Sequence, residues 1–193
     1  GVINYNKVNI NKLNPTARAR MGIYLINQNP IAIEGVSNAM MLRTALSEKL
    51  NDYVKIFDFN EELKKMCEKL KIPVNFIHRN INEGMSGGER KKMELLHMWI
   101  LKPKFIVLDE IDSGLDVDSL KIVAKSIKEY LEEYQASLLI ITHHDQILKY
   151  LKPDYVHVLN DKKIVKTGNI TLAHEIELNG FEAFNISGKD NYE

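Results

Sequence analysis

Several features are scarce in this 193-residue sequence, and each absence excludes a class of protein. One cysteine, Cys67, cannot by itself form a disulfide framework, a zinc site or a four-cysteine cluster site. Basic and acidic residues balance at 26 each, so the basic excess of a nucleic-acid-binding surface is missing. No apolar run reaches the length of about 18 residues that a transmembrane helix needs.

The remaining composition is that of an ordinary globular protein. Apolar residues make up 45% of the chain and charged residues 27%, which is typical of a domain with a buried core. The length predicts one domain, with room for a small subdomain. Asn, Ile and Lys are used heavily, which suggests an AT-rich coding genome.

Two short apolar runs predict strands of a buried parallel sheet. Residues 105–108 and 138–141 are continuous runs of large apolar side chains, a pattern typical of strands that are covered on both faces. Helical periodicity follows Ser86 as far as Leu101 and resumes after Asp116, a residue type that caps helices. Strands that alternate with helices predict an α/β fold with a mostly parallel core sheet.

A helical subdomain is expected between about residues 37 and 85, where the spacing of apolar residues is helical. Asp58 or Asn60 is the expected N-cap of its second helix. The α/β core would then comprise residues 1–36 and 86–184, followed by a polar tail at 185–193. Within the core we expect edge strands at 2–10, a hairpin at 155–166 and a last helix at about 171–178.

Acidic residues and a histidine follow the two predicted buried strands. Asp109 and Glu110 end the first strand, and Thr142 and His143 end the second. Because ligands of open α/β sheets bind outside the carboxyl ends of the strands, these groups predict one shared site. An apolar strand that ends in Asp-Glu is typical of phosphoryl transfer, in which the Asp holds Mg²⁺ and the Glu polarises the attacking water.

A glycine pair opens the helix that precedes the first of these strands. Gly87 and Gly88 would leave backbone N–H groups accessible to an anion, and Ser86 would add a hydroxyl donor. A plain turn with a helix N-cap is the alternative interpretation of this segment.

Five short motifs follow one another along the chain in a characteristic order. They are Gln28, Ser86–Glu89, Asp109–Glu110, Ser113–Asp116 and Thr142–His143. This order and spacing resemble the ABC ATPase domain family, and the resemblance implies a role for each motif. Gln28 would lie near Mg²⁺ and the γ-phosphate of ATP, and Asp109 would hold the Mg²⁺.

The resemblance also implies the catalytic residues and the contacts to a second copy. Glu110 would be the catalytic base, and His143 would contact the γ-phosphate, with His144 as a bystander. The signature loop, together with Asp116 near the dimer interface, would meet the nucleotide of the paired subunit. That loop consists of Ser86, Gly87, Gly88 and Glu89.

Within this family the chain most resembles the SufC group, the ATPase subunits of the SUF iron–sulfur cluster assembly system. The acidic run Asp109–Asp118 carries the likeness, together with Gln28–Asn38, Ile147–Leu159 and Ile164–Gly168. The implied partners are the SufB and SufD scaffold subunits and, on ATP binding, a second copy of the chain. No nucleic-acid partner and no direct membrane insertion are expected.

One departure from the family pattern concerns the phosphate-binding loop. The Gly-x-x-x-x-Gly-Lys-Ser/Thr loop of active members is missing, and the one Gly-Lys pair, Gly188–Lys189, is followed by Asp. That loop supplies most phosphate contacts in this class. We therefore expect this chain to be part of a longer ATPase whose N-terminal P-loop unit is not included, and to be inactive by itself.

Two other functions stay open. An ATPase subunit of an ABC transporter would share every catalytic motif, and a silent binding module would have lost the phosphate-binding loop. A chromosome-maintenance ATPase head is disfavoured because the sequence has no long heptad stretch. The Asn, Ile and Lys usage favours a plastid location, such as an apicoplast, with the cytoplasm as the alternative.

Overall fold

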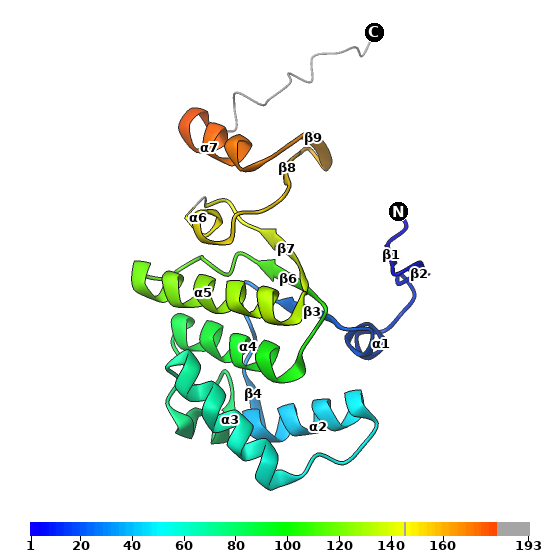
Figure 1. The fold of residues 1–193 in the computed structure, drawn as a ribbon, viewed down its shortest axis with the longest axis vertical. Coiled ribbons are helices and arrows are strands. Elements are labelled where there is room, and N and C mark those ends of the chain that lie inside the picture. Colours follow the sequence, from blue (N-terminus) through cyan, green and yellow to red (C-terminus); the bar gives the residue numbers. More distant parts are fainter. Residues whose placement is uncertain (145, 181–193) are drawn as a thin grey trace. The chain divides into compact units, whose positions relative to one another are not determined.

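The computed structural model describes residues 1–144 and 146–180. The chain divides into two compact units, Gly1–Thr142 and His143–Glu193 (Figure 1). The predicted division into core, helical subdomain and tail is a different one and stays a prediction. The predicted polar tail and the end of the predicted core lie outside the described residues.

A three-stranded parallel sheet forms the centre of the first unit. Its order is β3 (Ile23–Ile26), β6 (Phe105–Asp109) and β7 (Ser137–Ile141), so the predicted parallel α/β sheet is confirmed. The register aligns Ile26 with Leu108 and Asp109 with Ile141. The carboxyl ends of all three strands therefore meet at one edge.

Two long helices, α4 (Gly87–Leu101) and α5 (Val117–Tyr134), contribute a large part of the apolar core of this unit. Buried polar atoms fix their relative position. Trp99 Nε1 donates to Ser126 Oγ at 2.8 Å, and the Tyr130 hydroxyl donates to the Pro103 carbonyl at 2.7 Å. Each buried donor thus has an acceptor, as a close-packed interior requires.

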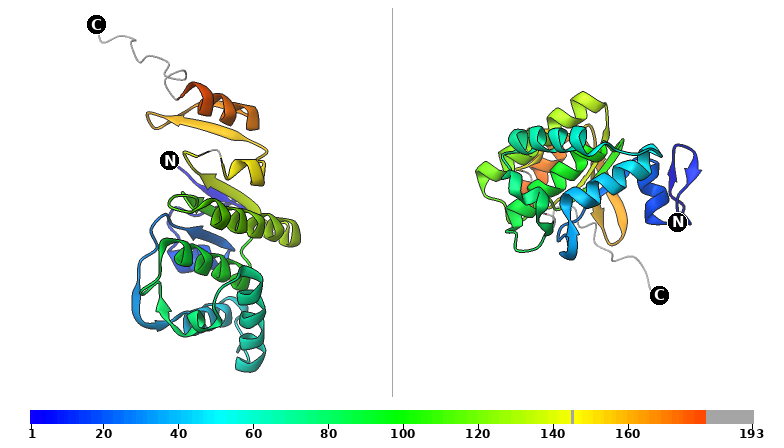
Figure 2. Two further views of the ribbon diagram at one scale, coloured as in Figure 1. Left: turned by 90° about the vertical axis from the view of Figure 1, so that its left-hand side faces the viewer. Right: turned by 90° about the horizontal axis from the view of Figure 1, so that it is seen from below.

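The helical segment contains α2 (Asn38–Leu50), α3 (Ile56–Leu70) and the 3₁₀ helix η1 (Val74–His78), flanked by the paired strands β4 (Ile33–Ser37) and β5 (Asn80–Ile81). Helix α4 packs against α2, α3 and α5 (Figure 2). The expected N-cap of α3 was wrong. Lys55 takes that position without a side-chain hydrogen bond. Asp58 lies in the first turn, where its negative charge interacts favourably with the helix dipole.

The N-terminal residues form a small hairpin, β1 (Asn4–Tyr5) and β2 (Val8–Asn9), followed by α1 (Pro15–Arg20). The hairpin agrees with the predicted edge strands. The Tyr5 ring stacks on Phe105 of β6 with 5.8 Å between ring centroids, which attaches the hairpin to the sheet.

The second unit contains α6 (Leu148–Leu151), the hairpin β8 (Val156–Asn160) and β9 (Lys163–Gly168), and α7 (Ile170–Asn179). Asp161 and Lys162 both have positive φ, at 43° and 62°, as a two-residue hairpin turn of matching twist requires. The predicted hairpin and last helix are confirmed. None of the helices in the described part of the chain is long and apolar enough to cross a bilayer.

One face of the three-stranded sheet differs from the sequence-based expectation. Ile106 and Leu108 are fully buried, but Leu25, Leu139 and Ile141 on the opposite face are each about half exposed. The expectation that the strand at 138–141 is buried on both sides was therefore wrong. β7 is an edge strand of the described sheet, and alternate side chains of a strand point to opposite faces.

A buried histidine on α4 is held neutral by its surroundings. Asn38 donates its side-chain amide to the carbonyls of Phe76 and Arg79, so its Oδ1 faces the His97 ring at 3.0 Å. Because Oδ1 can only accept, His97 Nε2 carries the hydrogen. Burial lowers the pKa of His97 from 6.5 to about 4.

Acid should therefore destabilise the fold through His97. Between these two pKa values the unfolded chain binds a proton that the folded chain does not, so the free energy of unfolding falls as pH falls. Between about pH 7.5 and about pH 5 we expect the wild type to lose about 2 kcal/mol more than His97→Gln, which keeps a donor for Asn38. Urea unfolding at both pH values measures this difference. Glu94, which faces the ring, is present in both proteins, and equal losses would contradict the assignment.

Candidate active site

Two predicted site residues meet at the carboxyl edge of the sheet. Gln28 follows β3, Asp109 ends β6, and Glu110 comes next. The Gln28 side-chain Nε2 donates a hydrogen bond to Glu110 Oε2. The structure thus brings together the amide that is predicted to lie near the metal and the predicted catalytic carboxylate. The amide oxygen of Gln28 does not take part in this hydrogen bond.

The backbone of Glu110 is strained and is held on several sides. Its φ of +47° lies in the left-handed region, which is uncommon for a residue with a Cβ atom. Its N–H donates to the Ile141 carbonyl at 2.9 Å, and its carbonyl accepts from Ser113 N–H and from Lys91 Nζ, each at 3.1 Å. Such strain persists only where the surroundings determine the conformation.

Lys91 is a site residue that the sequence analysis missed. Its side chain reaches from the second turn of α4 to the carbonyls of Glu110 and Ser113, and only 4% of the residue is exposed. Burial lowers the pKa of the ammonium group, and the nearby charges of Asp112 and Glu110 oppose that shift. The sequence feature that could have revealed Lys91 is a lysine among the buried positions of an amphipathic helix. Lysine is rarely buried unless it is paired.

Asp112 anchors the same turn from the other side. It is buried, and its Oδ2 accepts a hydrogen bond from Thr142 Oγ1 at 2.7 Å. Within the first unit, the turn from Glu110 to Ser113 is therefore tied to α4 by Lys91 and to the end of β7 by Thr142.

The Ser86–Glu89 loop has the cap geometry of the alternative interpretation. Ser86 Oγ accepts from Glu89 N–H at 3.3 Å, and Glu89 Oε2 accepts from Ser86 N–H at 2.7 Å, which together form a capping box. The hydrogen bond from the Ser86 backbone lowers the pKa of Glu89. A carboxylate in this position stabilises the helix start, and the predicted nucleotide contact of Glu89 stays a prediction.

The glycine pair of the same loop presents an open surface. A Cβ atom at Gly87 would meet nothing within 4 Å, and one at Gly88 would meet only the Leu115 side chain at 3.7 Å. The internal packing of this chain therefore does not require glycine at these positions. The first N–H groups of a helix have no partner inside the helix, so this surface leaves room for the close approach of an anion.

Asp116 has a defined local role as the N-cap of α5. Its carboxylate accepts from the Ser119 N–H and from the Ser119 hydroxyl, both at 2.8 Å. These hydrogen bonds lower the pKa of Asp116. The predicted contact of Asp116 with a paired subunit is a separate matter and stays a prediction.

Residues from three of the predicted motifs line a cavity of about 220 Å³. Gln28, Gly87 and Ser113 all line it, together with Lys91 and Arg90. Ligand sites in proteins usually measure about 300–1,000 Å³, so this cavity is smaller than a complete nucleotide pocket.

The residues at the strand ends fit Mg²⁺. Carboxylate and amide oxygens are its preferred protein ligands, and Asp109 and Gln28 supply one of each. Among the described residues, no group of three His, Cys, Asp or Glu side chains could hold a metal ion. Mg²⁺ is usually bound by one or two protein groups together with substrate phosphates and water.

His143 belongs to the second unit, so its predicted convergence with Asp109 and Glu110 stays a prediction. Its ring lies against that of His144, with 3.8 Å between the centroids. His144 was expected to be a bystander, and the ring contact shows that the two side chains interact.

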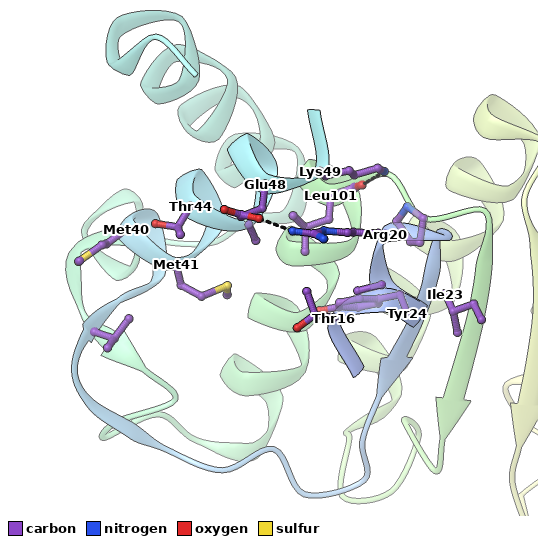
Figure 3. Close-up of a pocket in the computed structure, with 14 residues that line it drawn as sticks. Thr16, Arg20, Ile23, Tyr24, Met40, Met41, Thr44, Glu48, Lys49 and Leu101 are labelled. Atoms are coloured by element: carbon purple, nitrogen blue, oxygen red, sulfur yellow. Dashed lines mark hydrogen bonds and ion pairs between the residues drawn. The ribbon is translucent and has the colours of Figure 1, made fainter. Parts of the chain in front are cut away.

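A second cavity, of about 510 Å³, lies in the first unit away from these motifs. Figure 3 shows Met41 and Tyr24 on its walls and the Arg20–Glu48 ion pair, at 2.6 Å, beside it. Met40 of α2 also lines this cavity and is 58% exposed.

Comparison with known proteins identifies relatives over nearly the whole chain. A family model described as ABC transporter matches residues 1–113. "Probable ATP-dependent transporter SufC" of Escherichia coli is 40% identical, over 94% of this chain and 74% of its own length. "Probable ATP-dependent transporter ycf16" of Cyanophora paradoxa is also 40% identical, over 96% of this chain and 73% of its own.

Solved structures agree on the fold. The ATP-binding cassette MJ0796, in a dimeric post-hydrolysis state bound to ADP and Pi, superimposes with a TM-score of 0.73 at 14% identity, over 86% of this chain and 72% of that chain. The cassette MJ1267 superimposes with a TM-score of 0.67 at 20% identity, over 95% and 76%. At this identity the likeness shows the ABC cassette fold and nothing finer.

Replacing Lys91 tests whether it supports the Glu110 turn. Lys91→Met keeps the apolar stem, removes the lysine donor of the Ser113 carbonyl and removes one of the two donors of the Glu110 carbonyl, which should lower the free energy of unfolding by about 1–3 kcal/mol. Urea denaturation measures the change. Lys92→Met on the next position of α4 is the matched control, and an equal effect of both substitutions would remove the support role of Lys91.

Proposed function

Since the chain belongs to the ABC transporter family of ATPases, we propose that it acts as the ATPase subunit that drives iron–sulfur cluster assembly on a SufB–SufD scaffold. The observation that carries this proposal is the 40% identity to a relative named SufC over 94% of the chain. The acidic run Asp109–Asp118, which carries the likeness to the SufC group, includes the buried Asp112. The hydrogen bond that Asp112 accepts from Thr142 gives this acidic residue a structural role.

The geometry supports a role of Glu110 as the general base. Its carboxylate accepts from Gln28, which orients it, and a carboxylate oriented in this way can take the proton of an attacking water. Gln28 orients this carboxylate and can turn its own amide oxygen toward a cation held by Asp109. Bound Mg²⁺ would neutralise the charge that develops on the phosphate oxygens.

The open Gly87–Gly88 surface supports pairing with a second copy. The accessible helix start would bind the terminal phosphate of the ATP held by the partner subunit. His143 would contact the γ-phosphate of the ATP held by its own subunit. ATP binding would then close two copies together, and that motion would rearrange the scaffold. The solved relative MJ0796 is described as dimeric, which supports this arrangement.

A transporter ATPase subunit is the second candidate. The relatives are named probable ATP-dependent transporters, and the matching family is described as ABC transporter. Co-purification with a membrane permease, and none with SufB or SufD, would favour it. For localisation we favour a plastid, which the ycf16 relatives support, and the cytoplasm is the alternative that the Escherichia coli relative supports.

Glu110→Gln tests the catalytic assignment in the full-length protein. Removing the base should slow ATP hydrolysis by roughly 10²–10⁴-fold while ATP binding is largely kept. Single-turnover phosphate release and nucleotide binding by fluorescence measure the two effects. Glu132→Gln, on the surface of α5, is the control. A loss of binding as large as the loss of turnover would count against the role of Glu110.

The scaffold should contact the 510 Å³ cavity and the adjoining Gln28–Asn38 stretch, which share Val36. An acidic side chain on the cavity wall would disfavour an apolar partner, so Met41→Asp should abolish co-purification with SufB–SufD. Met66→Asp, on the half-buried face of α3, is the control with the same chemical change. Retained scaffold binding by Met41→Asp, with unchanged melting temperature, would place the contact elsewhere.

A further inference from the structure

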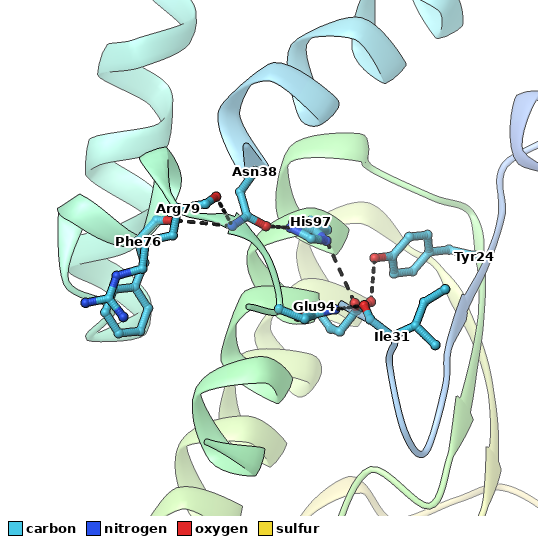
Figure 4. Close-up of polar contacts among 8 residues, drawn as sticks. Tyr24, Ile31, Asn38, Phe76, Arg79, Glu94 and His97 are labelled. Carbon is cyan, nitrogen blue, oxygen red and sulfur yellow. Dashed lines mark hydrogen bonds and ion pairs between the residues drawn. The ribbon is translucent and has the colours of Figure 1, made fainter. Parts of the chain in front are cut away.

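Glu94 occupies the interior of the first unit, in the middle of α4. Its side chain is 12% exposed, and the Tyr24 hydroxyl donates to its Oε2 at 3.0 Å (Figure 4). Asn82, which is 4% exposed, lies beside Glu94 and lowers the pKa of its carboxyl group. One carboxyl group on α4 therefore holds partners from β3 and from the segment after β5.

These two partners hold the chain on both sides of Gln28. Tyr24 lies in β3, before Gln28, and contacts Glu94 directly. Ile31 follows Gln28, and its carbonyl accepts from Asn82 Nδ2 at 2.9 Å. The connection between β3 and β4 is thus bonded to Glu94 at one end and, at the other, to Asn82, which lies beside Glu94. Gln28 itself is exposed, so its position depends on these attachments and on its contact with Glu110.

The hydrogen positions around Glu94 follow from the contacts of its neighbours. His97 Nε2 donates to Asn38, so its Nδ1 faces Glu94 Oε1 with a lone pair, at 4.0 Å, which is too long for a hydrogen bond. Burial raises the pKa of Glu94, and its contacts with Tyr24 and Asn82 oppose that shift. Burial and the neighbouring Glu94 raise the pKa of Tyr24, which stays a donor.

We propose that Glu94 is a positioning residue for ATP hydrolysis, because it fixes both ends of the Gln28 connection to the helix that begins with the Ser86–Gly88 loop. The inference rests on the proposed roles of Gln28 and Glu110. Glu94 acts through Tyr24 and Asn82 and does not touch the nucleotide. Loss of the attachment frees Gln28 and lets the Glu110 carboxylate turn away from the attacking water, while the groups that bind ATP stay in place.

Steady-state ATPase kinetics of the full-length protein test the inference. Glu94→Ala should lower kcat about tenfold with little change in KM, since misplacement of a catalytic group affects the transition state more than binding. Glu94→Gln keeps an acceptor for Tyr24 and should stay within about threefold of the wild type. Tyr24→Phe removes one attachment with minimal change of shape and should lower kcat as well.

Tyr130→Phe is the matched control, because it removes another buried tyrosine hydrogen bond, to Pro103, far from this connection in the sequence. If Tyr24→Phe and Glu94→Ala reduce kcat no more than Tyr130→Phe does, the inference is overturned. A purely structural role predicts equal losses of melting temperature and of activity in all three.

A double-mutant cycle with Gln28→Ala gives the decisive result. If Glu94 acts through Gln28, the double variant is no slower than Gln28→Ala within about twofold, whereas independent effects would multiply. Multiplied effects therefore overturn the inference. The control for the underlying function is Glu110→Gln: if that variant hydrolyses ATP normally, the proposed active site fails, whatever Glu94 does.

Discussion

The buried ammonium group of Lys91 is the constraint around which the site is arranged. A charge taken out of water is costly unless it is paired, so the carbonyls and carboxylates near Lys91 have to converge on it. They belong to the turn that follows β6, and this requirement fixes the turn against α4. The strained backbone of Glu110 follows from the same requirement, because its carbonyl must point at the lysine.

Helix α4 links several parts of the first unit through polar side chains along its length. Lys91 contacts the Glu110 turn, Glu94 contacts β3, and His97 contacts the start of α2. Each contact is desolvated and therefore specific in geometry. Tyr24 takes part in both the Glu94 contact and the larger cavity, because its hydroxyl donates to Glu94 and its side chain lines that cavity. A partner in that cavity would therefore contact the same network that holds Gln28.

The sequence predicted the parts of the fold that depend on local pattern. The strand that ends at Asp109, the helix that begins after Ser86 and the cap at Asp116 were all recognisable from residue types at short spacing. Lys91 and Glu94 were not, since a charged residue on a helix is usually solvated and only tertiary contacts reveal its burial. The cap of α3 was missed because Lys55 holds that position without a side-chain bond.

The left-handed backbone at Glu110 has a consequence for protein engineering. This conformation costs a residue with a Cβ atom roughly 1–2 kcal/mol of stability, and it costs glycine almost nothing. Selection for thermal stability alone would therefore enrich glycine at this position and remove the carboxylate that is proposed as the general base. The proposed general base thus occupies a position at which the local backbone favours glycine, so this position would report whether a variant library was selected for stability or for turnover.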